Sequence, residues 1–218
     1  MAGKLSDYQR KLRVWYREAR YSALMTGGRR NELIEARLTH LFRLTNRFLS
    51  DLGVDYWLVY GTLLGQHRCN GLIPGDRDLD FGVHERDYAT ILRSRHLLPP
   101  GLVLYDTSHK HYGPKLCATW VGWEADIYFY KDDGTTLQSY EKSRNIGDMQ
   151  PFPRTYVYPK RPTTFLGEST FIPNDSLAYL THTYGYIGAN AVKDPKTGYW
   201  YPKEKRNTGT ETENSGIS

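Results

Sequence analysis

The 218-residue sequence predicts an α+β fold with one folded domain. Two patterns indicate it: apolar residues recur at helical spacing in the first quarter of the chain, and short segments of alternating polarity follow through the middle. A chain of this length can bury roughly 70 to 75% of its unfolded surface, so it can form a stable core without disulfides. We expect a basic N-terminal helix at 1–30, the folded domain at 31–202 and a flexible polar tail at 203–218.

Two helices are predicted before the first strand. From Leu5 to Met25, apolar residues lie among arginines in the pattern of an amphipathic helix with a basic face. Such a helix can lie on an anionic membrane, although a solvated basic face is the commoner outcome. The second helix, from Asn31 to Leu52, begins at an asparagine suited to N-capping and ends at Gly53.

The next segment joins a strand to a helix. Residues Tyr56 to Tyr60 predict a buried strand, and a helix is expected from Thr62 to Arg68. Gly61 and Thr62 would then stand at the N-terminus of that helix, where free backbone N–H groups and the helix dipole favour a phosphate. The sequence therefore predicts a phosphate-binding turn at this position.

Further strands and helices complete the predicted fold. The expected strands are Asp78 to Val83, Leu102 to Tyr105, Lys115 to Val121, Glu124 to Tyr130, and a hairpin within Thr164 to Pro173. A helix is expected from Glu85 to Leu98, and another begins at 174–176 and runs to Thr183. Residues Met149 to Pro162 show no sustained period and are expected to form an extended loop. These elements indicate a small mixed sheet with helices packed against it.

Charge and cysteine content limit the partners and the compartment. The 29 basic and 24 acidic residues give a net charge of +5, which favours nucleotides, sugar phosphates, lipid head groups or nucleic acid without choosing among them. Cys69 and Cys117 lack the spacing of a thiolate zinc site and indicate no disulfide framework, so a reducing compartment is expected. The N-terminus has no apolar signal segment and no 18 apolar residues run together. We expect a cytoplasmic protein. Peripheral membrane contact through the basic N-terminal helix is an open alternative.

Three aspartates are the candidate metal ligands. Residues two apart on a strand face the same way, so Asp78 and Asp80 would present carboxylates on one side while Leu79 and Phe81 face the core. Asp126 lies in a similar alternating segment and can complete the set from a neighbouring strand. Such oxygen ligands suit Mg²⁺ or Mn²⁺, which also take substrate phosphate oxygens. We predict that Asp78 and Asp80 bind the metal and that Asp126 binds it or acts as a base.

A solvated acidic turn or a calcium loop would also place several aspartates together. An EF-hand loop starting at Asp76 needs Gly at its sixth position and Glu at its twelfth, where the sequence has Phe81 and Asp87. A solvated turn does not explain the apolar residues between the aspartates. Asp76 precedes the alternating strand, so it is either a further ligand or only a cap of the turn.

A long motif surrounds these residues. It consists of Gly61-Thr62-Leu63-Leu64-Gly65, Arg68, Gly71, Leu72-Ile73-Pro74, Asp76 and Asp78-Leu79-Asp80. In this register the chain resembles the LicD/fukutin family, whose hallmark reads approximately G-T-L-L-G-x-x-R-x-x-G-[FL]-I-P-W-D-D-D-L-D. Weaker similarity includes Lys115-Leu116 and Glu124-Ala125-Asp126, and the resemblance covers roughly Leu33 to Tyr201.

The resemblance implies a nucleotidyltransferase-type mixed sheet flanked by helices, in which the Gly-Thr turn and the D-x-D strand hold a nucleotide diphosphate and its metal. Family members transfer a phosphorylated alcohol, such as phosphocholine or ribitol phosphate, from a CDP-linked donor to a glycan hydroxyl. Gly61 and Thr62 would cradle phosphate, with Arg68 and Lys115 as its charge partners. The expected partners are therefore a nucleotide-linked donor and a glycan acceptor, without nucleic acid, and the expected cofactor is Mg²⁺ or Mn²⁺.

Two departures from the family pattern bear on substrate choice. Gly75 stands where the family has Trp, and Arg77 stands where it has an acidic residue, so the transferred group could differ from choline. The leading hypothesis is a metal-dependent phosphotransferase that releases a nucleoside monophosphate. The alternatives are a nucleotidyltransferase that releases pyrophosphate and a non-catalytic module that binds a nucleotide or glycan.

Overall fold

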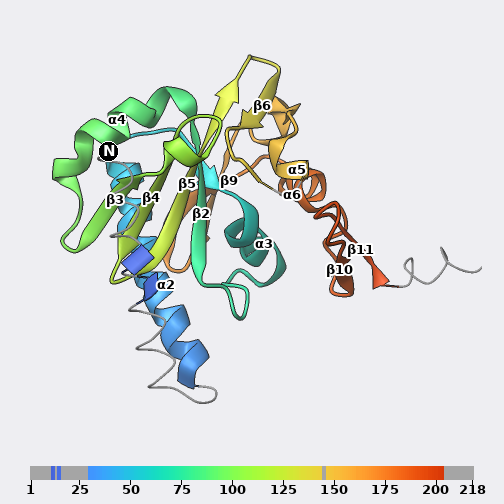
Figure 1. The fold of residues 1–218 in the computed structure, drawn as a ribbon, viewed down its shortest axis with the longest axis horizontal. Coiled ribbons are helices and arrows are strands. Elements are labelled where there is room, and N and C mark those ends of the chain that lie inside the picture. The colour runs from blue at the N-terminus through green and yellow to red at the C-terminus, as the bar shows by residue number, and fades with distance from the viewer. Residues whose placement is uncertain (1–10, 13, 16–28, 144–145, 204–218) are drawn as a thin grey trace, which may run out of the picture.

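A curled mixed sheet forms the centre of the protein in the computed structural model, which describes residues 11–12, 14–15, 29–143 and 146–203 (Figure 1). Within these residues the sheet has seven strands: β1 Tyr56–Leu58, β2 Asp78–His84, β3 Leu102–Asp106, β4 Lys115–Trp120, β5 Trp123–Asp132, β6 Thr136–Ser139 and β7 Phe152–Pro153. The order is β1-β2-β5-β4-β3, and β6 pairs with both β5 and β7. Strands β2 and β5 run parallel, and the other pairs are antiparallel.

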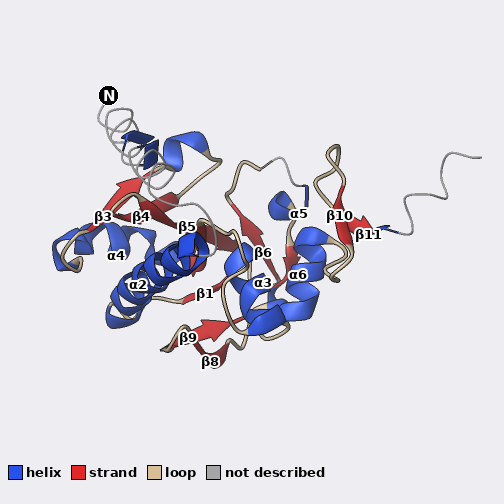
Figure 2. Ribbon diagram, turned by 90° about the horizontal axis from the view of Figure 1, so that it is seen from below, coloured by secondary structure: helices blue, strands red, loops and turns tan. Residues whose placement is uncertain are grey.

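Helices and two hairpins surround this sheet. The α-helices are α2 Arg29–Asp51, α3 Tyr60–Cys69, α4 Tyr88–Arg93, α5 Ile146–Met149 and α6 Ser176–Tyr184. The hairpins pair β8 Arg161–Phe165 with β9 Glu168–Ile172, and β10 Ala191–Lys193 with β11 Trp200–Pro202. Short 3₁₀ turns occur at Glu85–Asp87, Ser94–Leu97, Ser108–Lys110 and Arg154–Tyr156. Figure 2 shows β3 and α4 on one side and the β10-β11 hairpin on the other, with α3 and α6 between them.

The core lies between α2 and one face of the sheet. The alternate residues Leu79, Phe81 and Val83 of β2 are fully buried, as are Ala125 and Ile127 of β5. Phe42 of α2 lies between two aromatic rings, with its ring centroid 5.5 Å from that of Phe81 and 5.2 Å from that of Phe165. The opposite face of the same strands is thereby left for polar side chains.

The predicted α+β fold is confirmed, with local differences. The strand predicted at Tyr56–Tyr60 ends at Leu58, because Tyr60, at a φ of 46°, already begins α3. The helix predicted at Glu85–Leu98 is a short α-helix between two 3₁₀ turns, and Ile91 is the one buried residue of α4, too little apolar contact to support a long helix. The segment predicted as a loop at Met149–Pro162 contains β7 and a 3₁₀ turn.

The two ends of the chain are described only in part. The predicted N-terminal helix lies largely outside the described residues, although 11–12 and 14–15 are helical. The predicted polar tail lies outside them from residue 204 onward. None of the described helices combines the length and the apolar character that crossing a membrane requires.

Gly82, in the middle of β2, has no room for a side chain. A Cβ atom there would lie 2.7 Å from Val59 Cγ1 and 2.8 Å from the Trp57 ring, and both of these residues are fully buried. We expect Gly82→Ala to lower the free energy of unfolding by about 1 to 3 kcal/mol, measured by urea denaturation. Gly71→Ala is the control, because the nearest atoms to its Cβ would be at 3.8 Å. Equal stability of the two variants would contradict this view of the core.

Candidate functional site

The two parallel strands at the centre of the sheet bring carboxylates onto one face. In the β2-β5 register, Asp80 lies beside Asp126, and Asp78 lies beside Glu124. Register partners on parallel strands point to the same side of a sheet, and these residues alternate with the buried core positions. The structure therefore places Asp78, Asp80 and Asp126 together on the face opposite α2, the arrangement that their alternation in the sequence predicts.

The turn that begins α3 packs against these carboxylates. A Cβ atom on Gly61 would lie 3.3 Å from Oδ2 of both Asp76 and Asp80, closer than most Cβ contacts, so a side chain here would press on both carboxylates. The backbone N–H of Asp80 donates to Thr62 Oγ1 at 2.8 Å, and Thr62 N lies 3.4 Å from Asp80 Oδ2. Thr62 is only 2% exposed. Its hydroxyl thus ties the turn to β2, and Gly61 is the member of the predicted pair that lines the open cleft.

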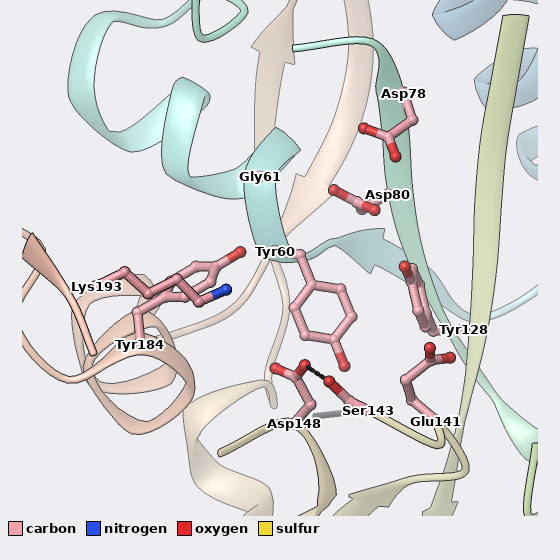
Figure 3. A pocket seen from close by; sticks show the side chains of 10 residues that line it. All are labelled: Tyr60, Gly61, Asp78, Asp80, Tyr128, Glu141, Ser143, Asp148, Tyr184 and Lys193. Carbon is pink, nitrogen blue, oxygen red and sulfur yellow. Dashed lines mark hydrogen bonds between the residues drawn. The ribbon is translucent and has the colours of Figure 1, made fainter. Parts of the chain in front are cut away.

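A cleft of about 380 Å³ opens over this face of the sheet (Figure 3). Its lining residues come from β2, β5, α3, α5, α6, β10 and the segment after β6; they are Tyr60, Gly61, Asp78, Asp80, Tyr128, Glu141, Ser143, Asp148, Tyr184 and Lys193. Tyr60 and Tyr128 meet edge to face with their ring centroids 4.6 Å apart. The cleft therefore combines aromatic walls with several carboxylates.

Burial and neighbouring carboxylates oppose the ionisation of both Asp78 and Asp80. Asp80 is 8% exposed; burial, followed by the charges of Asp78 and Asp126, raises its pKa well above the ordinary value. Asp78 lies at the more exposed end of β2, yet desolvation by its surroundings and the charge of Asp126 raise its pKa to about 6. Two close carboxylates of this kind are stabilised in the charged form by a bound cation.

Lys115 forms ion pairs with two carboxylates, Asp126 and Glu141, and Glu141 lines the cleft. Its Nζ is 3.1 Å from Asp126 Oδ2, 2.9 Å from Glu141 Oε2 and 3.8 Å from the centroid of the Tyr128 ring. Burial alone would lower the pKa of Lys115, but the attraction of Asp126 and Glu141 outweighs burial and raises it. The Tyr128 hydroxyl also donates to Asp126 Oδ2, at 3.2 Å. Carboxylates thus already engage the ammonium group of Lys115, and its contact with a phosphate stays a prediction.

The structure does not bring Arg68 into the cleft. Arg68 lies in the last turn of α3, and the rise of about 1.5 Å per residue separates it by about 10 Å along the helix from Gly61. Its guanidinium group donates to the carbonyl of Ile187 at 2.7 Å. The predicted contact of Arg68 with pyrophosphate is therefore replaced here by a contact with the backbone.

Sequence reasoning missed several lining residues. Glu141, Ser143 and Asp148 fall in a segment without periodicity, where only the density of polar residues could have drawn attention. Burial raises the pKa of Asp148 to about 6, and Ser143 Oγ donates to its Oδ2 at 2.5 Å. Asp148 is thus, like Asp78, a carboxylate of the cleft whose pKa is about 6.

The carboxylate oxygens on this face can be considered as ligands for a divalent cation. Among the residues that the structure describes, no three His, Cys, Asp or Glu side chains converge as a ready-made metal cage. One oxygen of Asp126 contacts both Lys115 and Tyr128, and the part of Asp126 in a metal site stays a prediction. Asp78 and Asp80 are two close candidate oxygen donors, and Mg²⁺ commonly uses one or two carboxylates with water and substrate phosphate.

Comparison with known proteins agrees with this geometry. The family model described as LicD/FKTN/FKRP, nucleotidyltransferase domain, matches residues 53–175. Ribitol-5-phosphate transferase FKTN of Homo sapiens is 26% identical over 164 residues, 70% of this chain and 33% of that protein. The Mus musculus protein of the same name is 44% identical over 52 residues, 24% of this chain and 11% of that protein.

A bacterial sequence also matches a short stretch of the chain. An uncharacterized protein of Rickettsia prowazekii is 42% identical over 50 residues, 23% of this chain and 19% of that protein. The chain thus spans about a third or less of the length of these relatives. Because the family model covers more than half of the chain and includes the Gly-Thr turn and all three aspartates, the chain belongs to the LicD/FKTN/FKRP family.

Proposed function

We propose that the protein is a LicD-type phosphotransferase that moves a phosphorylated alcohol from a nucleotide-diphosphate-linked donor, specifically a CDP-linked one, to a glycan hydroxyl. The observation that supports this most is the position of Asp78 and Asp80 beside Gly61 at the N-terminus of α3, in an open cleft. Relatives of this chain are named ribitol-5-phosphate transferases, which is in keeping with transfer of a phospho-alcohol.

Asp78 and Asp80 would hold Mg²⁺ or Mn²⁺ in the cleft. The ion would neutralise phosphate charge and make the reacting phosphorus more electrophilic. Gly61 leaves space beside the carboxylates where a side chain would otherwise lie. Thr62 fixes the strand and the helix relative to each other, so the two carboxylates keep their positions. Such preorganised charge is the main contribution that a protein makes to phosphoryl transfer.

The attacking hydroxyl must lose a proton as its oxygen bonds to the donor's distal phosphorus and CMP leaves. Two carboxylates are placed to accept it. Asp126 is the predicted base, and one of its oxygens is shared between Lys115 and Tyr128. Asp148 lies across the cleft, and a pKa of about 6 suits a general base that works near neutral pH.

Product analysis tests the proposal. The protein is incubated with Mg²⁺ or Mn²⁺, a panel of CDP-, UDP- and GDP-linked alcohols and sugars, and glycan acceptors, and the released products are separated by chromatography. We expect CMP from a CDP-linked donor, and much less from Asp80→Asn. Release of pyrophosphate would instead favour a nucleotidyltransferase. Metal-dependent nucleotide binding without any product would favour a non-catalytic module.

A further inference from the structure

Lys193 is a basic side chain in a cleft whose other charged lining residues are carboxylates. It is the last residue of β10, opposite Trp200 of β11 in the hairpin register. Its ammonium group reaches toward the middle of the cleft beside Tyr184 (Figure 3). Its charge acts on Asp148, but it makes no hydrogen bond or ion pair with any residue that the structure describes. Lys193 is therefore available to a ligand.

A phosphate bound in the cleft would be repelled by the carboxylates there, and the charge of Lys193 would offset this repulsion. A divalent cation on Asp78 and Asp80 would balance those two carboxylates only, which leaves a donor pyrophosphate close to Glu141 and Asp148. Lys115 is engaged by Asp126 and Glu141. Of the cations considered for phosphate, Lys193 alone lines the cleft without a protein partner among the described residues.

Arg68 fixes the hairpin that carries Lys193. Besides the bond to Ile187, its guanidinium lies 3.5 Å from the Gly188 carbonyl and 6.0 Å from the centroid of the Trp200 ring. Trp200 also accepts a backbone hydrogen bond from Tyr186 at 2.9 Å. One end of α3 thus touches the carboxylates through Gly61, and its other end holds the hairpin.

We propose that Lys193 binds the phosphate groups of the nucleotide-linked donor across the cleft from Asp78 and Asp80, and that Arg68 is a positioning residue that acts through Lys193. The identity of the donor rests on the proposed function. Lys193 itself lies beyond residues 53–175, where the family model matches. Arg68, predicted to bind pyrophosphate directly, would instead set the position of the lysine that does.

Binding of CDP in the presence of Mg²⁺, measured by isothermal titration calorimetry on the full chain, tests Lys193. We expect Lys193→Ala to weaken binding about 10-fold, the loss of one charge-assisted hydrogen bond, and Lys193→Arg to stay within about 3-fold of the unmodified protein. Lys196→Ala is the matched control, because Lys196 is exposed and belongs to the same hairpin but does not line the cleft. Unchanged binding in Lys193→Ala, an equal loss in Lys196→Ala, or no binding by the unmodified protein would overturn the inference.

A double-mutant cycle tests Arg68. We expect Arg68→Ala to weaken CDP binding, and Arg68→Ala combined with Lys193→Ala to bind no more weakly than Lys193→Ala alone. Circular dichroism checks that each variant is folded. Additive losses would mean that Arg68 contacts the ligand itself and would overturn its positioning role.

Turnover separates this inference from the proposed function. If the unmodified protein releases CMP and Lys193→Ala leaves the KM of the donor unchanged, the inference fails alone. If CDP binding depends on Lys193 but no donor of the panel is turned over, the inference stands and the proposed function fails. In an active enzyme, Lys193→Ala should raise KM more than it lowers kcat, because the donor phosphates are held before the reaction begins.

Discussion

Replacing Asp78 with asparagine should lower turnover by about 10³-fold or more and, in the absence of metal, make the protein more stable at neutral pH. Asparagine keeps the shape of the side chain and removes its charge. A divalent cation would then lose one of the two ligands in the Asp78-Asp80 pair. The same change removes the charge of Asp78, which adds to burial in raising the pKa of Asp80. One substitution should therefore shift activity and stability in opposite directions.

The gain in stability has a defined pH window. The folded-state pKa of Asp78 is raised from an ordinary value of 3.8 to about 6, so the folded protein binds more protons than the unfolded chain between these pH values. The stability of the unmodified protein therefore falls as pH rises through this window, and the full penalty remains above it. Because Asp78 is partly exposed to solvent, we expect a gain of only about 1 kcal/mol in Asp78→Asn near pH 7.5, and none near pH 4.

Thermal unfolding with and without Mg²⁺ or Mn²⁺ measures both effects. The metal should raise the Tm of the unmodified protein and leave that of Asp78→Asn nearly unchanged, since a ligand stabilises only the state that binds it. Asp51→Asn serves as the control, because it removes one negative charge at an exposed position at the end of α2. Full turnover in Asp78→Asn, or an equal gain in Asp51→Asn, would contradict the assignment.

Local patterns in the sequence predict the parts of the site that a single strand or turn creates. Alternation places Asp78 and Asp80 on one face because side chains on a strand have a period of two. A strand followed directly by a helix predicts a turn at Gly61 and Thr62, and the structure places Gly61 in the first turn of α3, beside two carboxylates. In both cases the predicted feature depends on residues near in sequence.

Features that depend on distant pairing are not available from a single sequence. Alternation marks Asp126 as a candidate on a neighbouring strand, but the parallel register of β2 with β5 places it beside Asp80, and no local pattern encodes that register. Asp148 and Lys193 enter the cleft from a four-residue helix and a three-residue strand, too short to show periodicity. Arg68 was predicted from its place in the motif to bind phosphate, whereas the length of α3 directs it to the hairpin.

Replacing Lys115 with methionine should destabilise the protein strongly at neutral pH. Methionine fills most of the space but leaves Asp126 and Glu141 facing each other without the ammonium group that pairs with both. Lys115 is 6% exposed, while the two carboxylate side chains keep 25% and 16% of their surface in water. Losing the partner of a fully buried ion pair costs about 3 to 5 kcal/mol; with this residual solvation we expect about 2 to 3 kcal/mol, measured by urea denaturation.

The pH dependence of stability and two further variants identify why Lys115→Met is less stable than the unmodified protein. The raised pKa of Lys115 means that its charge is fully present below its ordinary pKa of 10.5, so the unmodified protein keeps this contribution at neutral pH and down to the pH at which Asp126 and Glu141 become protonated. In Lys115→Met the deficit should shrink below about pH 4, where the carboxylates are protonated, and Glu141→Gln added to Lys115→Met should recover part of it. Lys142→Met, at the exposed neighbouring position, should change stability by less than about 0.5 kcal/mol. A deficit that stays the same at every pH would point to lost packing over Tyr128 instead of unpaired charge, and would separate the structural role of Lys115 from its electrostatic one.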